Sequence, residues 1–590
     1  MLPLAPPAPA LRPAGPARPA LLLACVLAAT VPTLLAYNQP PSATLLNQCV
    51  AVALWGGVAW VLAPARWPRG AGALLAALGV LLAGVALSWG LGSLPASLAW
   101  LAAGLLAGAG VMVLAGAGAA QAPGGTAALA ALATGLLVAG LLGSAVALVQ
   151  VFAPGWTDGS LIAHSGLVGR AVGNLRQPNH LGSLLLWALA ALALLVASGR
   201  LPRSLAWACA AVMVLAIELT ASRTGAAGLA VLLLWALVDR RLPPRARWLL
   251  AALPLLYVIA YFGMGWWGSV SQQSLGAGAR LAAEGTAAID SPNSRLNIWR
   301  NALALIAANP WVGVGFGEFN LAWTLTAFAN RPTAFFDHTH NLALQLAVEL
   351  GLPAAATVLL LMATALWQAG RRAWRATGDA GLAARTAWVL VLLTLLHSAV
   401  EYPLWYAYFL MPAALAWGYA LGTPEAGGWP RPAPAPGAAA WGLLAGALMT
   451  AGGALAVLDY QRAVVIYAPG DRAGSLGERI ARGQHSPLFA HHADYAAATN
   501  DAPPADAALG LLRATHSLLD TRLMLAWARH LDATGQVDAA RWLAQRLREF
   551  KNAEADAFFA PCAVGGADLF QCQPPQRAHG WREFTQPAPR

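Results

Sequence analysis

The stretch "NHLGSLLLWALAALALLVAS", Asn179 to Ser198, runs for twenty residues without a lysine, arginine, aspartate or glutamate. A helix of about 20 residues rises roughly 30 Å, which is the thickness of a bilayer's hydrocarbon core. Backbone polar groups inside lipid must bond to one another, and a helix satisfies this requirement within one segment. The stretch therefore predicts a membrane-spanning helix.

The same pattern recurs along most of the chain. Of the 590 residues, 58% are hydrophobic and only 10% are charged. We therefore predict an all-α polytopic membrane protein with about thirteen transmembrane helices. Their expected positions are 20–37, 44–63, 71–90, 94–117, 127–153, 179–198, 204–221, 224–238, 248–265, 353–370, 386–400, 404–421 and 438–457.

The arginines between these spans predict the orientation. With the N-terminus inside, the inner segments hold fifteen arginines and the outer segments hold seven. This asymmetry obeys the positive-inside rule. An odd number of spans then leaves the C-terminal region outside. The seven outer arginines are Arg170, Arg176, Arg223, Arg280, Arg295, Arg300 and Arg331.

The charge also divides the chain into parts. Residues 458–590 hold 14 basic and 14 acidic residues, so the net charge of +11 comes from the membrane part, 22 basic minus 11 acidic. This excess reports membrane topology, and we expect no nucleic-acid partner. We predict a transmembrane catalytic domain at 1–457, with a large outer loop at 266–352, and an outer helical domain at 458–590.

Both outer parts show helix signals. In the loop, Ser291-Pro292 is expected to start a helix that ends at Asn309-Pro310, with its apolar face on the bilayer or on the spans. In the C-terminal region, residues 504–550 predict successive amphipathic helices with a break at Thr534-Gly535. A packed helical cap and a peptide-binding groove both fit this repeat-like pattern. Cys562 and Cys572 lie where an oxidising compartment would permit a disulfide.

Two outer segments place polar groups beside spans. "GRAVGNLRQPNHLGS", Gly169 to Ser183, offers the amides Asn174, Gln177 and Asn179, which suit a polyhydroxylated or phosphorylated ligand; an ordinary polar turn is the alternative. "LTASRTGAAG", Leu219 to Gly228, forces Arg223 to the membrane surface. That arginine could hold phosphate, snorkel to the interface, or pair with Glu218.

A third segment, "FFDHTHNLALQLAVELGLP" (Phe335 to Pro353), carries two histidines. His338 and His340 are two residues apart, so a matched pair on one surface is not expected. A zinc site would also need Asp337, and no further ligand set stands nearby. Asn341, Gln345 and Glu349 recur every four residues, and we expect a short interfacial helix at 340–350 that shows this stripe to a cavity. A stripe that serves only packing is the alternative.

A fourth segment, "HSAVEYPLWYAYFLMP" (His397 to Pro412), joins two spans. An aromatic belt at the membrane interface explains its tyrosines and Trp405. It does not explain Glu401.

Gly351 and Pro353 of the third segment are expected to break the interfacial helix before its span.

Together these segments resemble a known family. "GNLRQPNH", "SRTG", "SRLNIWRNAL", "NPWVGVGFGEFN", "DHTHNLALQLAVELG" and "EYPLWY", in this order over residues 169–406, are similar to the bacterial protein O-oligosaccharyltransferases. These form the PglL-like branch of the O-antigen ligase and polymerase superfamily. The resemblance implies a membrane enzyme that transfers a glycan from a polyprenyl (undecaprenyl) diphosphate carrier to Ser or Thr hydroxyls of pilin or another exported protein. It also implies a periplasmic active site in the bacterial inner membrane, without metal or nucleotide cofactor.

The resemblance also assigns roles to residues. His340 matches the family's histidine before asparagine and is expected to be the general base, with His338 in reserve. Arg223 and Arg295 would hold the leaving diphosphate, with Arg300 as the alternate to Arg295. Gln177, Asn179 and Tyr402 match motifs expected to orient glycan or acceptor. The remaining candidates for substrate contact are Asn174 and Glu349.

Two other functions remain open at this point. An O-antigen ligase would transfer the glycan to lipid A core sugar, whereas "GNLRQPNH", "EYPLWY" and the C-terminal domain favour a protein acceptor. A lipid-carrier transporter would place ionisable groups near the middles of several spans. This chain instead collects them at the outer ends of its spans.

Overall fold

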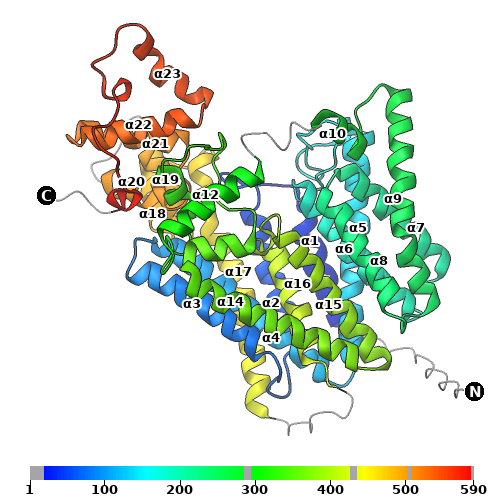
Figure 1. Cartoon of the computed structure of the whole chain (residues 1–590). Helices are drawn as coiled ribbons and strands as arrows, with labels where there is room; N and C mark the ends of the chain where they lie inside the picture. Colours follow the sequence, from blue (N-terminus) through cyan, green and yellow to red (C-terminus); the bar gives the residue numbers. More distant parts are fainter. Residues whose placement is uncertain (1–18, 285–293, 426–434, 501–506, 586–590) are drawn as a thin grey trace, which may run out of the picture.

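The computed structural model describes residues 19–284, 294–425, 435–500 and 507–585. Within these ranges the chain forms α-helices and short 3₁₀ turns, and no β-strand (Figure 1). The prediction of an all-α fold is confirmed. The expected helix start at Ser291-Pro292 lies outside the described residues.

Each predicted span contains one apolar helix. Nine helices in the described ranges are long and apolar enough to cross a membrane: α3 (Gly72–Gly90), α4 (Ala96–Gln121), α5 (Gly125–Phe152), α6 (Pro178–Ala197), α7 (Arg203–Thr220), α9 (Pro244–Ser271), α14 (Leu342–Arg375), α15 (Gly378–Ser398) and α17 (Pro436–Tyr467). Four apolar helices are shorter: α1 (Pro19–Leu34), α2 (Leu45–Val61), α8 (Arg223–Val238) and α16 (Ala407–Gly422). A multi-pass membrane protein is thus supported, while the number of thirteen spans stays a prediction.

The last helices of the bundle pack against the first. Helix α17 lies along α2, and α16 lies along α4. Glycines permit this close approach, because a Cβ added to Gly116 would lie 2.1 Å from the Leu415 carbonyl oxygen, and one added to Gly418 would lie 2.1 Å from that of Val113. Small residues at crossing points let membrane helices gain van der Waals contact without a hydrophobic driving force. Segments from the two ends of the membrane part therefore form one bundle.

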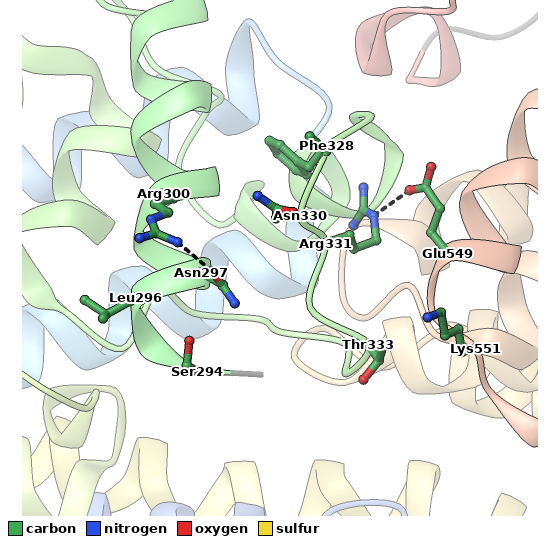
Figure 2. A pocket seen from close by; sticks show the side chains of 11 residues that line it. Ser294, Leu296, Asn297, Arg300, Phe328, Asn330, Arg331, Thr333, Glu549 and Lys551 are labelled. Carbon is green, nitrogen blue, oxygen red and sulfur yellow. Dashed lines mark hydrogen bonds and ion pairs between the residues drawn. The ribbon is translucent and has the colours of Figure 1, made fainter. Parts of the chain in front are cut away.

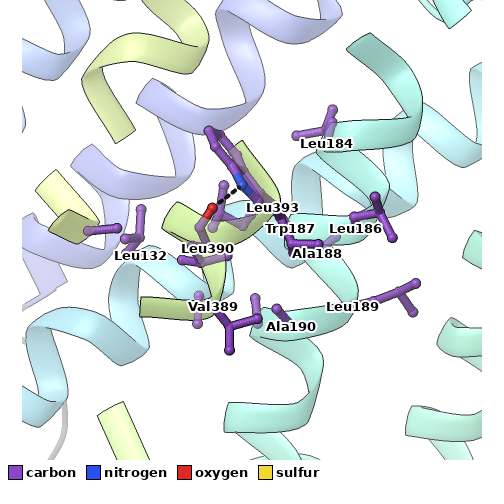
Figure 3. Close-up of a cluster of buried hydrophobic side chains, with 14 of the residues drawn as sticks. Leu132, Leu184, Leu186, Trp187, Ala188, Leu189, Ala190, Val389, Leu390 and Leu393 are labelled. Carbon is purple, nitrogen blue, oxygen red and sulfur yellow. Dashed lines mark hydrogen bonds between the residues drawn. The ribbon is translucent and has the colours of Figure 1, made fainter. Parts of the chain in front are cut away.

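Helix α6 is surrounded by other helices of the bundle. Its residues from His180 to Ala197 are all buried, and it contacts α5, α7, α8, α9 and α15. Its Trp187 Nε1 donates to the Leu390 carbonyl of α15 at 3.1 Å, within a cluster of leucines, alanines and valines (Figure 3). Pro178 stands in the first helical turn, and the Gln177 side chain caps the helix. The N-terminus of α6, with Asn179 and His180, is therefore held in a fixed place.

The loop predicted to lie outside the membrane forms α10 (Gly276–Glu284), α12 (Arg295–Ala308) and α13 (Phe319–Leu325). Helix α12 ends before Asn309, as predicted. Its apolar face, including Ala302 and Leu305, packs on α13 and on the start of α14, and it belongs to one buried cluster with residues of the C-terminal helices. Of the two expected surfaces, the spans are therefore the one that this face contacts, through α14, and the C-terminal domain adds residues to the same buried cluster.

The C-terminal helices cap the end of the bundle that carries α12, as the orange and red segments show (Figure 1). They are α18 (Leu476–Gln484), α19 (Ala490–Ala498), α20 (Ala507–Thr515), α21 (Thr521–Ala533), α22 (Val537–Glu549) and α23 (Asp556–Phe559). The predicted break at Thr534-Gly535 separates α21 from α22, and Cys562 and Cys572 form a disulfide. Residues of α21 and α22 share one core with α12, α13 and α14. The described helices thus form a packed cap.

Helix α14 contains the predicted break. Gly351 has φ of 75° and ψ of 165°, so residues 342–350 form a separate helical segment before the span. The left-handed φ suits glycine, and an added Cβ would lie 2.4 Å from the Trp311 carbonyl oxygen. The break aims the N-terminus of α14, which follows the two histidines, at the loop between α15 and α16.

Candidate active site

Glu401 is the centre of a polar cluster at the end of the bundle that carries α12. It lies between α15 and the 3₁₀ turn Pro403–Trp405, and its side chain is 8% exposed. His340 Nδ1 lies 2.8 Å from Glu401 Oε2, and Arg295 Nη2 bonds Oε1. Asn179 Nδ2 donates to the same Oε1 at 3.2 Å. One carboxylate therefore joins three residues that were predicted separately from the sequence.

The partners of Glu401 keep it ionised. Burial opposes the charge, but the hydrogen bond and charge of His340 and the charge of Arg295 outweigh it and lower the pKa of Glu401 to about 2. The group is therefore a carboxylate at any pH near neutral. It can orient an imidazole and a guanidinium at the same time.

The segment before α14 holds His340 in an unusual backbone conformation. His340 has φ of 56°, a left-handed value that is uncommon for a residue with a side chain. Thr339 is held on both sides: its N–H donates to Gln345 Oε1 at 2.7 Å, and its carbonyl accepts from Trp299 Nε1 at 3.0 Å. These bonds fix the conformation that turns the imidazole toward Glu401.

The two histidines lie on one surface, contrary to the expectation from their spacing. The His338 ring stacks on Tyr402 with centroids 4.1 Å apart, and the His340 ring meets the same Tyr402 edge-on at 5.0 Å. The prediction assumed a regular strand or helix, and the left-handed φ at His340 breaks that regularity. His338 Nδ1 lies 3.0 Å from Asp337 Oδ1, so the two rings have different carboxylate partners.

Arg223 begins α8 close to this cluster. The preceding residue, Ser222, caps α8 and donates from its hydroxyl to Asn179 Oδ1 at 2.6 Å. Asn179 therefore bridges Ser222 and Glu401. The N-termini of α6, α8 and α12 thereby meet, and each carries a predicted residue: Asn179, Arg223 and Arg295 respectively.

Other residues predicted for the site bond the backbone away from the Glu401 cluster. Asn174 is 4% exposed; its Oδ1 accepts from Ala163 N, and its Nδ2 donates to the carbonyls of Leu34 and Leu161. The structure therefore does not bring Asn174 to the cluster.

Gln177 and Glu218 also have local roles. Gln177 Oε1 accepts from His180 N at 2.7 Å as the cap of α6, two residues from Asn179. Glu218, the suggested partner of Arg223, accepts from Ala277 N at 2.9 Å. Each of these side chains thus holds a backbone group in place.

The polar stripe of α14 has divided roles. Asn341 caps the helix and donates to the Ala399 carbonyl at 3.0 Å. Gln345 holds Thr339 and donates to Glu349 Oε1 at 2.9 Å. Glu349 lines a cavity, as predicted, while the buried Gln345 holds its neighbours by hydrogen bonds.

This cavity is apolar, measures about 220 Å³ and adjoins the cluster. It lies between α3, α4, α14 and α16, and its lining is almost entirely aliphatic and aromatic. Glu349 and Trp405 belong to this lining, and the Trp405 ring meets the His338 ring edge-on at 5.0 Å. The cavity thus begins beside the two histidines and continues between apolar helices.

Arg300 lies away from Glu401. It is five residues after Arg295 on α12, a rotation of about 140° around the helix. Its Nη1 donates to Asn297 Oδ1 at 3.2 Å. The structure therefore separates Arg300 from the position of Arg295, for which it was the alternate. Within the described ranges, no three His, Cys, Asp or Glu side chains are grouped as a metal site would require.

Glu401 was not among the residues predicted for the site. The sequence nevertheless made Glu401 conspicuous, because an aromatic belt at the membrane interface does not explain a carboxylate between two spans. Ser222 gave no such signal, since a serine before a helix is an ordinary cap. Its contact with Asn179 depends on the packing of α6 against α8.

Comparison with known proteins finds three matching families. The O-antigen ligase family matches residues 208–359, which include Arg223, Arg295 and His340. The C-terminal family of virulence factor membrane-bound polymerases matches residues 385–560, and the protein glycosylation ligase family matches residues 171–196. The matched segments thus contain every member of the cluster.

A curated relative extends the likeness. The chain is 26% identical over 295 residues to the general O-oligosaccharyltransferase of Acinetobacter baylyi. The aligned part covers 48% of this chain and 49% of the relative, so the chain spans about half the length of the curated relative it matches. The matches confirm the resemblance drawn from the motifs: the chain is similar to the O-antigen ligase family over residues 208–359, and to the PglL-like protein O-oligosaccharyltransferases.

Proposed function

We propose that this protein transfers an oligosaccharide from a polyprenyl diphosphate carrier to Ser or Thr hydroxyls of exported proteins such as pilin, on the periplasmic side of the bacterial inner membrane. The observation that carries the proposal is the Glu401 cluster. It joins one histidine and one arginine through a single carboxylate and lies beside the start of α8, which carries Arg223.

His340 is the base in this proposal. When Nδ1–H donates to Glu401, the lone pair of the neutral imidazole is on Nε2. Nε2 then removes the proton of the acceptor hydroxyl as its oxygen attacks the anomeric carbon. The new bond is a glycosidic C–O bond, and the bond that breaks joins the anomeric carbon to the diphosphate.

The arginines stabilise the leaving group. The diphosphate departs with the bonding electrons, so negative charge grows on its oxygens. The Arg295 side chain is 39% exposed although it bonds Glu401, so a ligand can reach it. Arg223 is exposed at the start of α8, where the helix N-terminus adds further positive potential.

The apolar cavity supports a lipid-linked donor. Its aliphatic lining offers no fixed charge except Glu349 and suits an isoprenoid chain. Because Trp405 joins this cavity to the His338 ring, a chain bound there would place its diphosphate near the cluster. Tyr402, between the two histidines, is available to orient the sugar or the acceptor.

Transfer to lipid A core sugar is the second candidate, because the O-antigen ligase family covers residues 208–359. The two functions share the donor chemistry and differ in the acceptor. The match of residues 171–196 to the protein glycosylation ligases favours a protein.

Intact-mass analysis of a pilin co-expressed with this protein and a lipid-linked oligosaccharide tests the proposal. We expect the pilin to gain the mass of the oligosaccharide, and the His340→Ala variant to lose this gain. The exposed His485→Ala variant is the control. An unmodified pilin together with glycan-bearing lipopolysaccharide would instead establish the ligase activity.

A further inference from the structure

A second cavity, of about 680 Å³, lies on the other side of α12 from Glu401. Its walls come from the start of α12, from the loop 328–333 and from the end of α22 with Lys551. We call it the Arg300 cavity. Figure 2 shows Asn297 and Arg300 on one side of this space, and Arg331, Glu549 and Lys551 on the other. The membrane part and the C-terminal domain thus both contribute to it.

The cavity carries an excess of positive charge. Arg331 is 8% exposed, and its charge is offset by Glu549, whose Oε2 lies 2.8 Å from Arg331 Nε. Arg300 bonds the neutral amide of Asn297. Among the described residues, neither Arg300 nor Lys551 has a carboxylate partner. Two exposed cations therefore border a space large enough for a small ligand.

The rest of the lining suits a sugar. Asn297 and Asn330 supply amides, Ser294 and Thr333 supply hydroxyls, and Phe328 supplies an aromatic face. The Ser294 hydroxyl oxygen is buried and has no hydrogen-bond partner among the described residues. Amides and hydroxyls match a polyol, and a cation matches a carboxylate.

The position agrees with the proposed reaction. Arg295 and Arg300 are about 7.5 Å apart along the axis of α12. A glycan whose first sugar is held at Glu401 can therefore pass along this helix to the second cavity. We propose that the Arg300 cavity binds a distal, carboxylate-bearing sugar of the donor oligosaccharide; this inference rests on the proposed function for the identity of the donor.

The direct test uses free sugar, so it does not depend on transfer. Lys551 is the only lysine in the chain. A carbodiimide activates the carboxylate of a bound uronate, and the Lys551 amine displaces the urea to form an amide. We expect the purified full-length protein to gain the mass of a glucuronate-terminated disaccharide at Lys551. The matched glucose-terminated disaccharide should add nothing, and Arg300→Gln should reduce the adduct about tenfold.

Transfer kinetics provide the second test. With a polyprenyl diphosphate-linked disaccharide ending in glucuronate, Arg300→Gln and Lys551→Gln should each raise the donor KM about tenfold. With the glucose-ended donor, KM and kcat should not change. Arg472→Gln, which removes an exposed cation outside the cavity, is the control.

Three results would overturn the inference. One is an absent adduct at Lys551 with the glucuronate disaccharide. Another is an equal effect of the variants on both donors. A change in the KM of the acceptor protein alone would make the cavity a peptide site. Failure of the wild-type protein to transfer either glycan, with the Lys551 adduct present, would contradict the proposed function and leave the sugar site standing.

Discussion

At the scale of single residues, Glu401 decides the geometry of the cluster. Its two carboxylate oxygens bond the side chains of His340, Arg295 and Asn179, and the Glu401 side chain is nearly buried. A carboxylate that orients an imidazole fixes which ring nitrogen can act as a base. The two histidines differ in this respect, because His338 lies beside the more exposed Asp337.

Replacement of the histidines should separate their roles. We expect His340→Ala to lower the transfer rate at least about 100-fold, because a positioned base contributes that much or more. His338→Ala removes a ring that stacks on Tyr402 and should mainly raise KM. Initial rates with a purified donor and acceptor measure both effects. A larger loss of kcat in His338→Ala would reverse the assignment.

Replacement of Glu401 should change the pH dependence of stability. Because its pKa in the folded protein is about 2, below the ordinary 4.5, ionised Glu401 stabilises the fold fully above pH 4.5. This stabilisation is lost as the pH falls through about 2. The Tm of Glu401→Gln in detergent should therefore lie below that of wild type by a constant amount above about pH 5.

The difference in Tm should shrink below about pH 4. Glu554→Gln, which replaces an exposed carboxylate, controls for general effects of acid. A difference that stays constant down to about pH 2.5 would show that the carboxylate charge does not stabilise the cluster. We also expect Glu401→Gln to lower the transfer rate at neutral pH about tenfold or more.

At the scale of elements, the break in α14 positions the histidines. A continuous helix through residue 351 would move its N-terminus and the preceding His340. We expect Gly351→Ala to destabilise the protein by about 1–3 kcal/mol, because alanine resists the left-handed conformation. Its Cβ would also collide with the Trp311 carbonyl. Gly263→Ala in α9, where an added Cβ meets open space, is the matched control.

Thermal unfolding in detergent and transfer rate together measure the effect of Gly351→Ala. Both should fall, whereas Gly263→Ala should leave both close to wild type. A stable, active Gly351→Ala protein would mean that the break does not position His340.

At the scale of the whole molecule, a buried pair joins the loop between α9 and α14 to the C-terminal domain. His516 Nδ1 lies 2.7 Å from Glu318 Oε2, and the side chains are 1% and 5% exposed. The pair adjoins the core shared by α12, α13, α14 and the C-terminal helices. The C-terminal domain therefore contacts α13, which in turn packs on α12, the helix that carries Arg295.

Removal of this pair should loosen the domain. His516→Ala leaves the Glu318 carboxylate buried and unpaired, at a cost of roughly 3 kcal/mol. We expect faster hydrogen exchange in α12 and α21 and a lower transfer rate, while the exposed His485→Ala changes neither. Unchanged exchange in α12 would show that the cap does not support the active site.

The sequence by itself determined the membrane fold and most of the cluster. Runs of apolar residues about 20 long leave few alternatives to helices, and the break at Gly351 follows from glycine's conformational freedom. Asn179 and Arg223 stood out because polar groups beside spans are costly unless they have a use, whereas the family resemblance pointed to Arg295 and His340.

Only the tertiary structure decided which of these residues meet. Glu401 bonds Asn179 across 222 positions and Arg295 across 106, and no local pattern specifies such contacts. The two histidines share a surface because Thr339 is held by Trp299 and Gln345, which imposes a left-handed backbone on the next residue. Arg300 and Lys551 likewise border one cavity because the C-terminal domain packs onto α13 beside α12, and that packing depends on surface shape rather than on spacing in the chain.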